Sequence, residues 1–598
     1  MTSTVQPSIP DRLSQLRKKM ADHGLSAWIV PSSDPHSSEY VADHWQGRKW
    51  ISGFTGSAGT AVILRDKAGV WTDGRYFIQA AEEINETGFD LYKLGVPEAV
   101  SYEDWIIEGI AEGSKVGFDG KVLSYRFFVE FKKKCDKKNI QIVTDVDLLN
   151  DIWLDRPSLP CSQVNDYNLK YAGKSREDKL AEVRTEMKKL KAKHFILTTL
   201  DDIAWLFNIR GSDVLHCPVK LAYSIISINE VFLFIDKTKV PEELAENLSC
   251  SGIKLLNYDG IDREIKAIPS ETSVLVDPNI VNSHLVSLLV NGVTLIKSKS
   301  ITTELKAIKN PVEQEHLKEC HRKDGVAMVK FLKALDKKVP LGEVTELSAA
   351  EIVKGYRKEI DTFVDLSFTT IPGYASNGAM MHYASTEETS CVIGTDNFFL
   401  VDSGGQYFDG TTDITRTLNY GDLNREQRED YTLVLKGHID LAKAKFLKGT
   451  RGVQLDMLAR QPLWDKGINY ACGTGHGIGH FLNVHEGPQN ISTKFLDEEF
   501  KCGMNITNEP GIYRKNKWGI RIENIYLIIL SVENEFGTFY EFEPVTMCPI
   551  NTKPIVIEMM TDEEKVWLNE YHIQVYNNLS PYLNDDEQEW LKENTLAI

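Results

Sequence analysis

The sequence is poor in cysteine and has no pair of cysteines in a Cys-x-x-Cys arrangement. Its nine cysteines are scattered and odd in number, which favours reduced thiols over a disulfide framework. No apolar run approaches the roughly 18 residues of a membrane-spanning helix. The first residues, Met-Thr-Ser-Thr-Val-Gln-Pro-Ser, lack the basic start and apolar stretch of a signal peptide. These absences predict a cytoplasmic protein without a membrane anchor.

The chain also lacks excess positive charge. It carries 68 lysines and arginines against 86 aspartates and glutamates, a formal net charge of −18. This charge opposes binding to nucleic acids or to anionic membranes and is typical of a well-hydrated surface. The glycine-rich run at residues 53–59 lacks the Gly-Lys-Ser/Thr ending of a phosphate-binding loop, so we expect no nucleotide site there.

At 598 residues the chain is too long for a single hydrophobic core. A weak repeat of an amphipathic helix, a strand and a Trp-to-Gly segment occurs at residues 13–57 and again at residues 180–212, which favours two related α/β domains. Turn-rich or polar stretches at residues 155–160 and 297–303 indicate boundaries. The predicted domains are 1–157, 158–302, 303–552 and a C-terminal helical extension, 553–598.

Two aspartates follow β-prone segments in the last third of the chain. The apolar run at residues 398–401 ends at Asp402. After Asp409-Gly410, a good hairpin turn, an alternating segment carries Asp413. Two adjacent antiparallel strands would bring Asp402 and Asp413 together.

A second pair of carboxylates lies farther along the chain. Glu509 precedes a Pro-Gly turn, and period-two alternation places Arg521 and Glu523 on one strand face. Ile520 and Ile522 occupy the other face. An acid and a base beside core isoleucines indicate a buried polar site.

Between the two pairs, residues 473–487 contain five glycines and the histidines His476, His480 and His485. Glycines this dense allow close backbone approach. Three histidines within ten positions, flanked by four carboxylates, indicate a metal or catalytic site rather than surface residues.

Mostly oxygen donors with one imidazole favour a hard or borderline divalent ion, with manganese preferred and zinc, cobalt and iron left open. One such ion would leave a large negative excess. Two ions about 3.5–4 Å apart, sharing carboxylates and a hydroxide that acts as the nucleophile, would neutralise it.

Five motifs resemble those of the creatinase and aminopeptidase metallopeptidases, which share the pita-bread fold. They are Val401–Tyr407, Asp409–Thr417, Gly473–Gly479, Asn508–Tyr513 and Gly519–Asn524. Residues 71–77, 202–213 and 363–368 extend the similarity over nearly the whole chain. The resemblance implies two related N-terminal creatinase-like α/β domains followed by a C-terminal pita-bread (α+β) metallopeptidase domain. Within the family, the chain is most similar to the three-domain cytosolic Xaa-Pro aminopeptidases.

Carried over residue by residue, the resemblance implies that Asp402, Asp413, His476, Glu509 and Glu523 hold two metal ions. Asp413 and Glu523 would bridge them. His476 and Glu509 would complete the ligand set.

The resemblance also implies roles around the metals. His382 and His485 match family histidines that lie near the substrate, and His485 would stabilise the tetrahedral intermediate. Arg521 and Tyr513 would orient ligands or relay protons. Cys472 stands where similar enzymes have a histidine that shapes the proline-facing pocket, so affinity or specificity is expected to differ.

The spacing of the histidines leaves two registers for the metal ligand. His476 lies nine residues before His485 and matches the cytosolic branch of the family. His480 lies five residues before it and creates the prolidase-like pattern His-Gly-Ile-Gly-His. We expect His476 to be the ligand.

The resemblance implies a homodimeric aminopeptidase that removes the first residue of peptides with proline at the second position. Such a bond has no N–H, so proteases that need that donor handle it poorly. The free peptide amine would bind one metal or a nearby carboxylate. Two alternatives are a prolidase, which would cleave only dipeptides, and a non-catalytic peptide-binding scaffold of the same fold.

Overall fold

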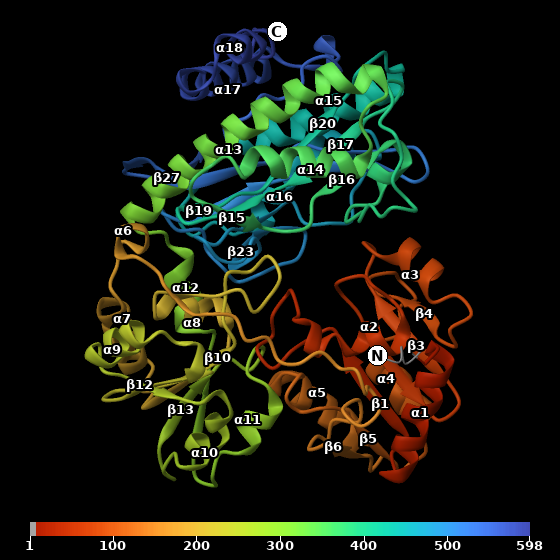
Figure 1. Cartoon of the computed structure of the whole chain (residues 1–598), viewed down its shortest axis with the longest axis vertical. Coiled ribbons are helices and arrows are strands. Elements are labelled where there is room, and N and C mark those ends of the chain that lie inside the picture. The colour runs from red at the N-terminus through yellow and green to blue at the C-terminus, as the bar shows by residue number, and fades with distance from the viewer. Residues whose placement is uncertain (1–6) are drawn as a thin grey trace. The chain divides into compact units, whose positions relative to one another are not determined.

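The computed structural model describes residues 7–598, which form two compact units (Figure 1). The first unit holds most of the chain up to Thr302. The second runs from Thr303 to Ile598 and also takes in two short earlier segments, Asn168–Lys174 and His216–Pro218. None of the described helices is long and apolar enough to cross a membrane.

The first half of the first unit is a six-stranded sheet in the order β4-β3-β2-β1-β5-β6. Its strands are β1 (Ala27–Pro31), β2 (Thr60–Leu64), β3 (Ala68–Thr72), β4 (Asp90–Lys93), β5 (Lys115–Gly117) and β6 (Gln141–Val143). Its helices are α1 (Ile9–Asp22), α2 (Gly47–Ser52), α3 (Phe77–Glu83), α4 (Tyr102–Gly109) and α5 (Tyr125–Asp136).

The second half repeats this sheet in the order β12-β11-β10-β8-β13-β14. Its strands are β8 (His194–Leu197), β10 (Ala222–Ser227), β11 (Val231–Ile235), β12 (Ile253–Leu256), β13 (Ser273–Val276) and β14 (Thr294–Lys297). Its helices are α7 (Arg176–Lys189), α8 (Leu200–Leu206), α9 (Glu242–Cys250), α10 (Ile261–Lys266) and α11 (Ser283–Ser287). β7 (Asn165–Asp166) and β9 (Ile209–Arg210) form a separate two-stranded pair.

Strand directions confirm the repeat seen in the sequence. β1 pairs antiparallel with β2 and parallel with β5, and β8 makes the same two kinds of pair with β10 and β13. Even the first helices begin alike. The hydroxyls of Ser8 and Ser175 accept the N–H of Asp11 and Asp178, three positions later, which caps α1 and α7.

The second unit combines long helices with several antiparallel sheets. Its helices are α6 (Leu169–Ala172), α12 (Ile301–Ala307), which spans the division between the units, α13 (Pro311–Lys338), α14 (Glu346–Arg357), α15 (Arg425–Ala442), α16 (Gly452–Trp464), α17 (Asp562–Leu579) and α18 (Asp585–Glu593). Asn310 and Glu313 form a reciprocal capping box that fixes where α13 begins.

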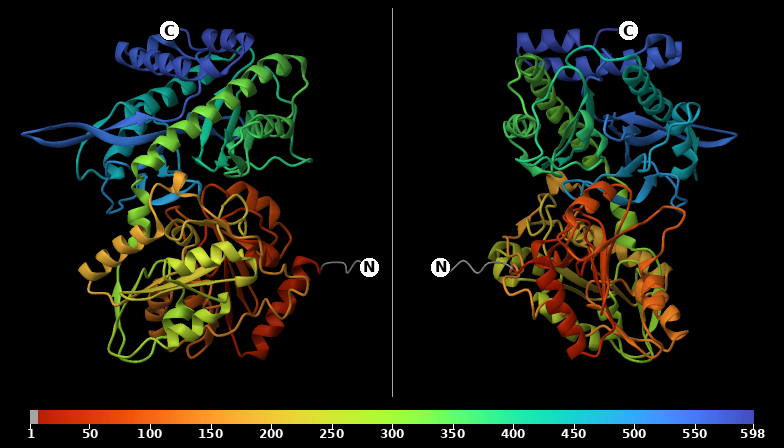
Figure 2. Two further views of the ribbon diagram at one scale, coloured as in Figure 1. Left: turned by 60° about the vertical axis from the view of Figure 1, so that its left-hand side comes forward. Right: turned by 90° about the vertical axis from the view of Figure 1, so that its right-hand side faces the viewer.

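Strands β15 to β28 make the sheets of the second unit. They are β15 (Phe363–Leu366), β16 (Ile371–Tyr374), β17 (Phe399–Ser403), β18 (Gly405–Tyr407), β19 (Gly410–Thr411), β20 (Ile414–Leu418), β21 (Lys445–Leu447), β22 (Gly475–Gly477), β23 (Glu486–Ile491), β24 (Asn505–Asn508), β25 (Gly511–Arg514), β26 (Trp518–Arg521), β27 (Asn524–Asn534) and β28 (Gly537–Pro544). β16-β17-β20 form one sheet and β21-β28-β27-β24 another. The ends of β27 and β28 extend beyond their neighbours as a two-stranded ribbon (Figure 2).

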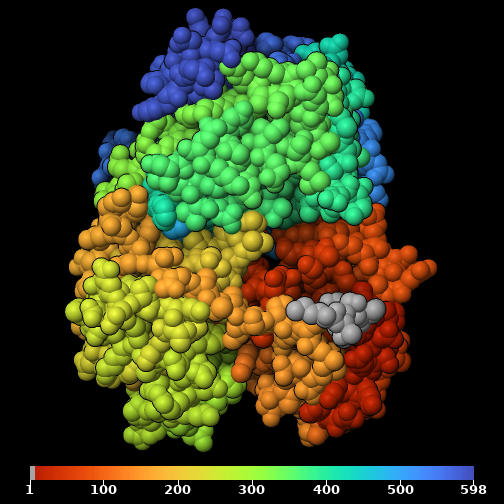
Figure 3. Space-filling view, viewed as in Figure 1, coloured from red at the N-terminus to blue at the C-terminus, as the bar shows by residue number. Residues whose placement is uncertain are grey.

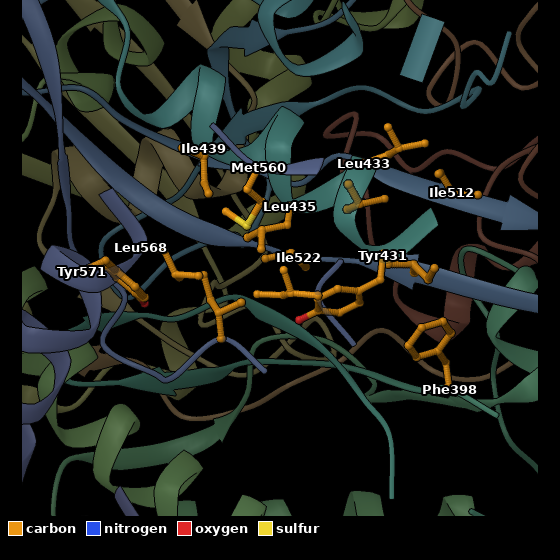
Figure 4. Close-up of a cluster of buried hydrophobic side chains, with 14 of the residues drawn as sticks. Phe398, Tyr431, Leu433, Leu435, Ile439, Ile512, Ile522, Met560, Leu568 and Tyr571 are labelled. Carbon is orange, nitrogen blue, oxygen red and sulfur yellow. The ribbon is translucent and has the colours of Figure 1, made fainter. Parts of the chain in front are cut away.

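The C-terminal helices share the core of the second unit. Tyr431 and Leu435 of α15 gather with Ile522 and with Leu568 and Tyr571 of α17 in one buried cluster (Figure 4). In the space-filling view, the dark blue residues of the last helices cover one end of this unit (Figure 3). Burial of such side chains stabilises a helix far more than its intrinsic propensity does, so α17 is an integral part of the unit.

Candidate metal centre

Asp402 and Asp413 are brought together by β17 and β20, which pair antiparallel with Asp402 opposite Thr415. This adjacency is as the sequence predicts. Two details differ. The turn at Asp409-Gly410 joins β18 to β19, and β20 begins only at Ile414. Asp413 is therefore an irregular residue just before β20.

The other three candidate ligands lie at strand ends or within a short strand. Glu509 directly follows β24, and His476 is the middle residue of β22. Glu523 lies between β26 and β27, so the single strand predicted for residues 519–524 is wrong: β26 pairs with β25, whereas β27 pairs with β24. Ile522 is nevertheless fully buried in the core, as expected.

The donor atoms converge on one point. One ligand atom from each of Asp413, His476 and Glu523 lies within 4.8 Å of the other two. His476 Nε2 is 3.7 Å from Asp413 Oδ2 and 3.5 Å from Glu509 Oε1. This group combines two carboxylates and an imidazole, with a third carboxylate within reach.

The electrostatics fit divalent cations. Burial and the neighbouring carboxylates raise the pKa of Asp413 and of Glu523 well above their usual values. The Oδ1 atoms of Asp402 and Asp413 are buried, and neither accepts a hydrogen bond from the described residues. Clustered carboxylate oxygens without donors are costly in a protein interior unless a cation compensates them. The donor set therefore suits hard divalent ions.

Arg521 braces this group from one side. Its guanidinium donates to Asp402 Oδ2, to the Tyr513 hydroxyl at 2.6 Å and to Thr415 Oγ1 at 3.0 Å. Thr415 in turn donates to Glu523 Oε2 at 2.7 Å. Asp402 and Glu523 are thus fixed through one shared network.

A second histidine, His485, lies beside His476. The ring of His485 meets the ring of His476 edge-on, with 4.3 Å between centroids. Burial lowers the pKa of His476 well below its usual value, and the charges of His485 and His382 add to this effect. His382 itself follows the 3-10 helix Ala375–Ala379 by three residues. His476 and His485 therefore lie together at the carboxylate cluster.

Known proteins share this architecture. Models of the creatinase/prolidase N-terminal domain match residues 12–150 and 155–313, the model of metallopeptidase family M24 matches residues 315–529, and that of the C-terminal region of the M24 peptidases matches residues 538–598. A probable Xaa-Pro aminopeptidase P of Coprinopsis cinerea is 39% identical, over 98% of this chain and 98% of its own. The chain belongs to metallopeptidase family M24. The predicted fold class, two creatinase-like α/β domains followed by a pita-bread metallopeptidase domain, is confirmed.

Other relatives of this M24 enzyme agree along its length. Aminopeptidase P2 of Arabidopsis thaliana is 38% identical, over 99% of this chain and 89% of its own. The crystal structure of X-prolyl aminopeptidase from Caenorhabditis elegans, a cytosolic enzyme with a di-nuclear active site, superposes with a TM-score of 0.95 at 33% identity. It covers 99% of this chain and 100% of its own. A prolidase from Thermococcus sibiricus shares the fold over only 63% of this chain, at 20% identity and a TM-score of 0.52.

Within the M24 domain, His476 and His480 face different surroundings. His480 is buried, and its Nε2 lies 3.1 Å from the carbonyl oxygen of Tyr171 in the segment Asn168–Lys174. Its ring lies near that of His316. This geometry favours the register in which His476 faces the carboxylates.

Cys472 lies at the edge of the same domain's large core cluster. Its carbonyl accepts a hydrogen bond from Arg460 at 2.8 Å. Burial, with the charge of Glu509, raises the pKa of the Cys472 thiol to about 12. These surroundings favour a packing role over a reactive thiolate.

Two threonines of the site were missed in the sequence. Thr415 bonds Glu523, and the Thr507 hydroxyl accepts the backbone N–H of His476 at 3.0 Å. Each belongs to a β-prone segment, where threonine is expected for its shape alone. Only the Thr-x-Thr alternation after Asp413 hinted that hydroxyls line this face.

Proposed function

We propose that this M24 enzyme is an Xaa-Pro aminopeptidase, which hydrolyses the bond between the first residue of a peptide and a proline at the second position. The observation that carries this proposal is the shared organisation of the whole chain with the Caenorhabditis elegans X-prolyl aminopeptidase, including both N-terminal domains. The prolidase of Thermococcus sibiricus covers only part of this organisation.

The residues that would hold two divalent ions are Asp402, Asp413, His476, Glu509 and Glu523. The support is the convergence of donor atoms from Asp413, His476 and Glu523, with Glu509 within reach of His476. The buried Oδ1 atoms of Asp402 and Asp413, which lack hydrogen-bond donors, add to it. Manganese is the proposed metal because the donors are mostly oxygen, and zinc or cobalt would also fit. When bound, the two ions would supply Lewis-acid charge and would lower the pKa of water enough to make it a nucleophile at neutral pH.

The protein's own groups then position the reaction. Arg521 and Tyr513 hold Asp402 in place through the Arg521 guanidinium. His485, edge-on to His476, donates a hydrogen bond to the oxygen that becomes negative in the transition state. The Glu509 carboxylate accepts the proton of the attacking water and then donates it to the leaving proline nitrogen.

The substrate pocket is proposed to lie along His382, His485 and Cys472. A thiol at position 472 is smaller than the usual histidine and a weaker donor, which leaves more room around the proline ring. All five candidate ligands are present, so a non-catalytic scaffold is not favoured.

We propose that the enzyme works in the cytoplasm as a homodimer. All nine cysteines are free, as expected of a reducing compartment. The Caenorhabditis elegans relative is a cytosolic enzyme. The dimer rests on the family resemblance.

The activity is tested by comparing three peptides with metal-loaded enzyme: an Xaa-Pro dipeptide, an Xaa-Pro tripeptide and the same tripeptide with alanine replacing proline. We expect release of the first residue from the proline tripeptide, with kcat/KM about 100-fold or more above that for the alanine tripeptide. Cleavage of the dipeptide alone would instead identify a prolidase, and no cleavage of any of the three would refute a peptidase role.

A further inference from the structure

An ion triad is buried behind the segment that carries His485. Glu486 is 2% exposed, and so are both of its partners, Lys306 and Lys309. Lys306 Nζ donates to Glu486 Oε2 at 2.7 Å, and Lys309 Nζ donates to the other carboxylate oxygen, Oε1. Two ammonium groups on opposite oxygens of one carboxylate fix the plane of that carboxylate.

Glu486 is the first residue of β23, at an irregularity in the strand pairing. β22 and β23 pair His476 with Asn490, yet the next pair joins Gly477 to Glu486, so the register shifts by several residues at this point. Hydrogen bonds of the ladder therefore hold Glu486 less firmly than they hold a residue inside a regular sheet. The two lysines supply the missing restraint.

Glu486 is covalently next to His485. His485 lies in the bend just before β23, and Glu486 is the first residue of that strand. A carboxylate held at Glu486 therefore fixes the backbone from which the neighbouring imidazole projects. The His485 ring meets the His476 ring with 4.3 Å between centroids. A rotation at Glu486 would move the His485 ring relative to the metal site.

The lysines are themselves held rigidly. Lys306 lies on α12 and Lys309 in the turn before α13. The Lys309 backbone N–H donates to Gly503 at 2.9 Å, and its carbonyl accepts from Gln314 at 2.7 Å. Lys309 Nζ also donates to the Lys306 carbonyl at 3.2 Å. These contacts make the lysine pair a fixed anchor.

We propose that Glu486, clamped by Lys306 and Lys309, is a positioning residue that aims His485 at the reacting carbonyl. This role rests on the proposed aminopeptidase function. A buried ion pair is poor evidence of stabilisation in itself, because desolvation offsets its Coulomb energy. Positioning His485 accounts for the buried triad, whereas a contribution to stability does not.

A double-mutant cycle with an Xaa-Pro tripeptide tests the proposal. Glu486→Gln keeps the shape of the side chain but removes the charge that both lysines hold. We expect kcat to fall by about 10-fold or more, with KM changed by less than about 3-fold and both metals retained. In a His485→Ala background, the same change should lower kcat by less than about 2-fold, because its effect passes through His485.

Two comparisons separate this role from a merely structural one. Lys309→Arg keeps the positive charge and should retain most of kcat. Lys309→Met removes that charge and should lower kcat as Glu486→Gln does. If Glu486→Gln does not fold, Lys309→Met takes its place in the cycle. Glu543→Gln, which breaks the part-exposed pair between Lys318 and Glu543, is the matched control and should leave kcat unchanged. Equal losses of kcat with and without His485, or no loss in Glu486→Gln, would overturn the proposal.

A crystal structure of Glu486→Gln gives an answer that does not depend on activity. We expect the His485 ring to leave its edge-on contact with His476. An unmoved ring would refute the clamp. If the wild-type enzyme cleaved none of the Xaa-Pro peptides, the proposed function would fail, while this crystal structure would still decide whether the triad positions His485.

Discussion

His476 and His480 are four positions apart in one glycine-rich segment, but only His476 faces the carboxylate cluster. We expect His476→Ala to lose metal and activity, because it removes the single nitrogen donor of the site. His480→Ala should keep its metal, since that ring contacts the Tyr171 carbonyl instead. Metal analysis of the two purified variants checks this, and the reverse pattern would mean that the other register is the right one.

Cys472 stands where the family resemblance implies a histidine in similar enzymes. Cys472→His should mainly change substrate binding, because neither the proposed ligands nor His485 depend on the thiol. We expect KM for Xaa-Pro peptides to shift by a factor worth about 1 kcal/mol or less, with a smaller change in kcat. Steady-state kinetics checks this. Loss of a metal ion in Cys472→Ala would show a chemical role for the sulfur instead.

Individual residues also show where the sequence was informative. The apolar run before Asp402 and the alternation after Asp413 predicted their shared sheet, because both patterns are local. Lys306 and Lys309 could not be predicted, because they meet Glu486 across 180 and 177 positions. Nothing local distinguishes a buried lysine from an exposed one before the fold is known.

At the scale of elements, the same limit explains the error at residues 519–524. Period-two alternation continues through Ile522 and Glu523, so the pattern predicts one strand. The break arises because β26 and β27 have different partners, β25 and β24. Pairing partners are a tertiary property. Of the two residues between the strands, Ile522 enters the core and Glu523 contributes a donor atom to the carboxylate cluster.

The helix α17 carries a histidine that makes stability depend on pH. His572 is fully buried, and its Nε2 accepts the N–H of Ile550 at 3.1 Å. Burial, with the charge of Arg416, lowers its pKa from 6.5 to about 4. Below pH 6.5, His572 is therefore protonated in the unfolded chain but stays neutral in the folded chain. The stability is complete above pH 6.5 and is lost as the pH falls towards 4.

The free energy of unfolding should fall between pH 7 and pH 5 in the wild type. In His572→Gln we expect this fall to be smaller by about 2 kcal/mol, because the variant has no group to protonate at that position. Unfolding in denaturant at the two pH values measures the difference. Groups elsewhere titrate equally in both proteins and cancel in the comparison. An identical loss in the two proteins would contradict the role given to His572.

At the scale of the whole molecule, a recurring helix, strand and Trp-to-Gly spacing predicted two related N-terminal α/β domains, and the matching strand orders of their sheets agree with this. The oligomeric state could not be predicted from composition, because composition does not show which surface another copy would cover. The family resemblance predicts a homodimer. Light scattering at micromolar concentration should give twice the chain mass of 67.6 kDa, and a monomer there would refute the prediction.

Five side chains of the M24 domain are proposed to hold two divalent ions. The most direct test is the number of ions bound per chain after loading with manganese and removal of the free metal, measured for the wild type, Asp413→Asn and Glu523→Gln. We expect two ions in the wild type and a loss of metal in both variants, because each substitution removes a negative charge from the proposed ligand set. Two tightly held ions in either variant, with full activity, would contradict the site.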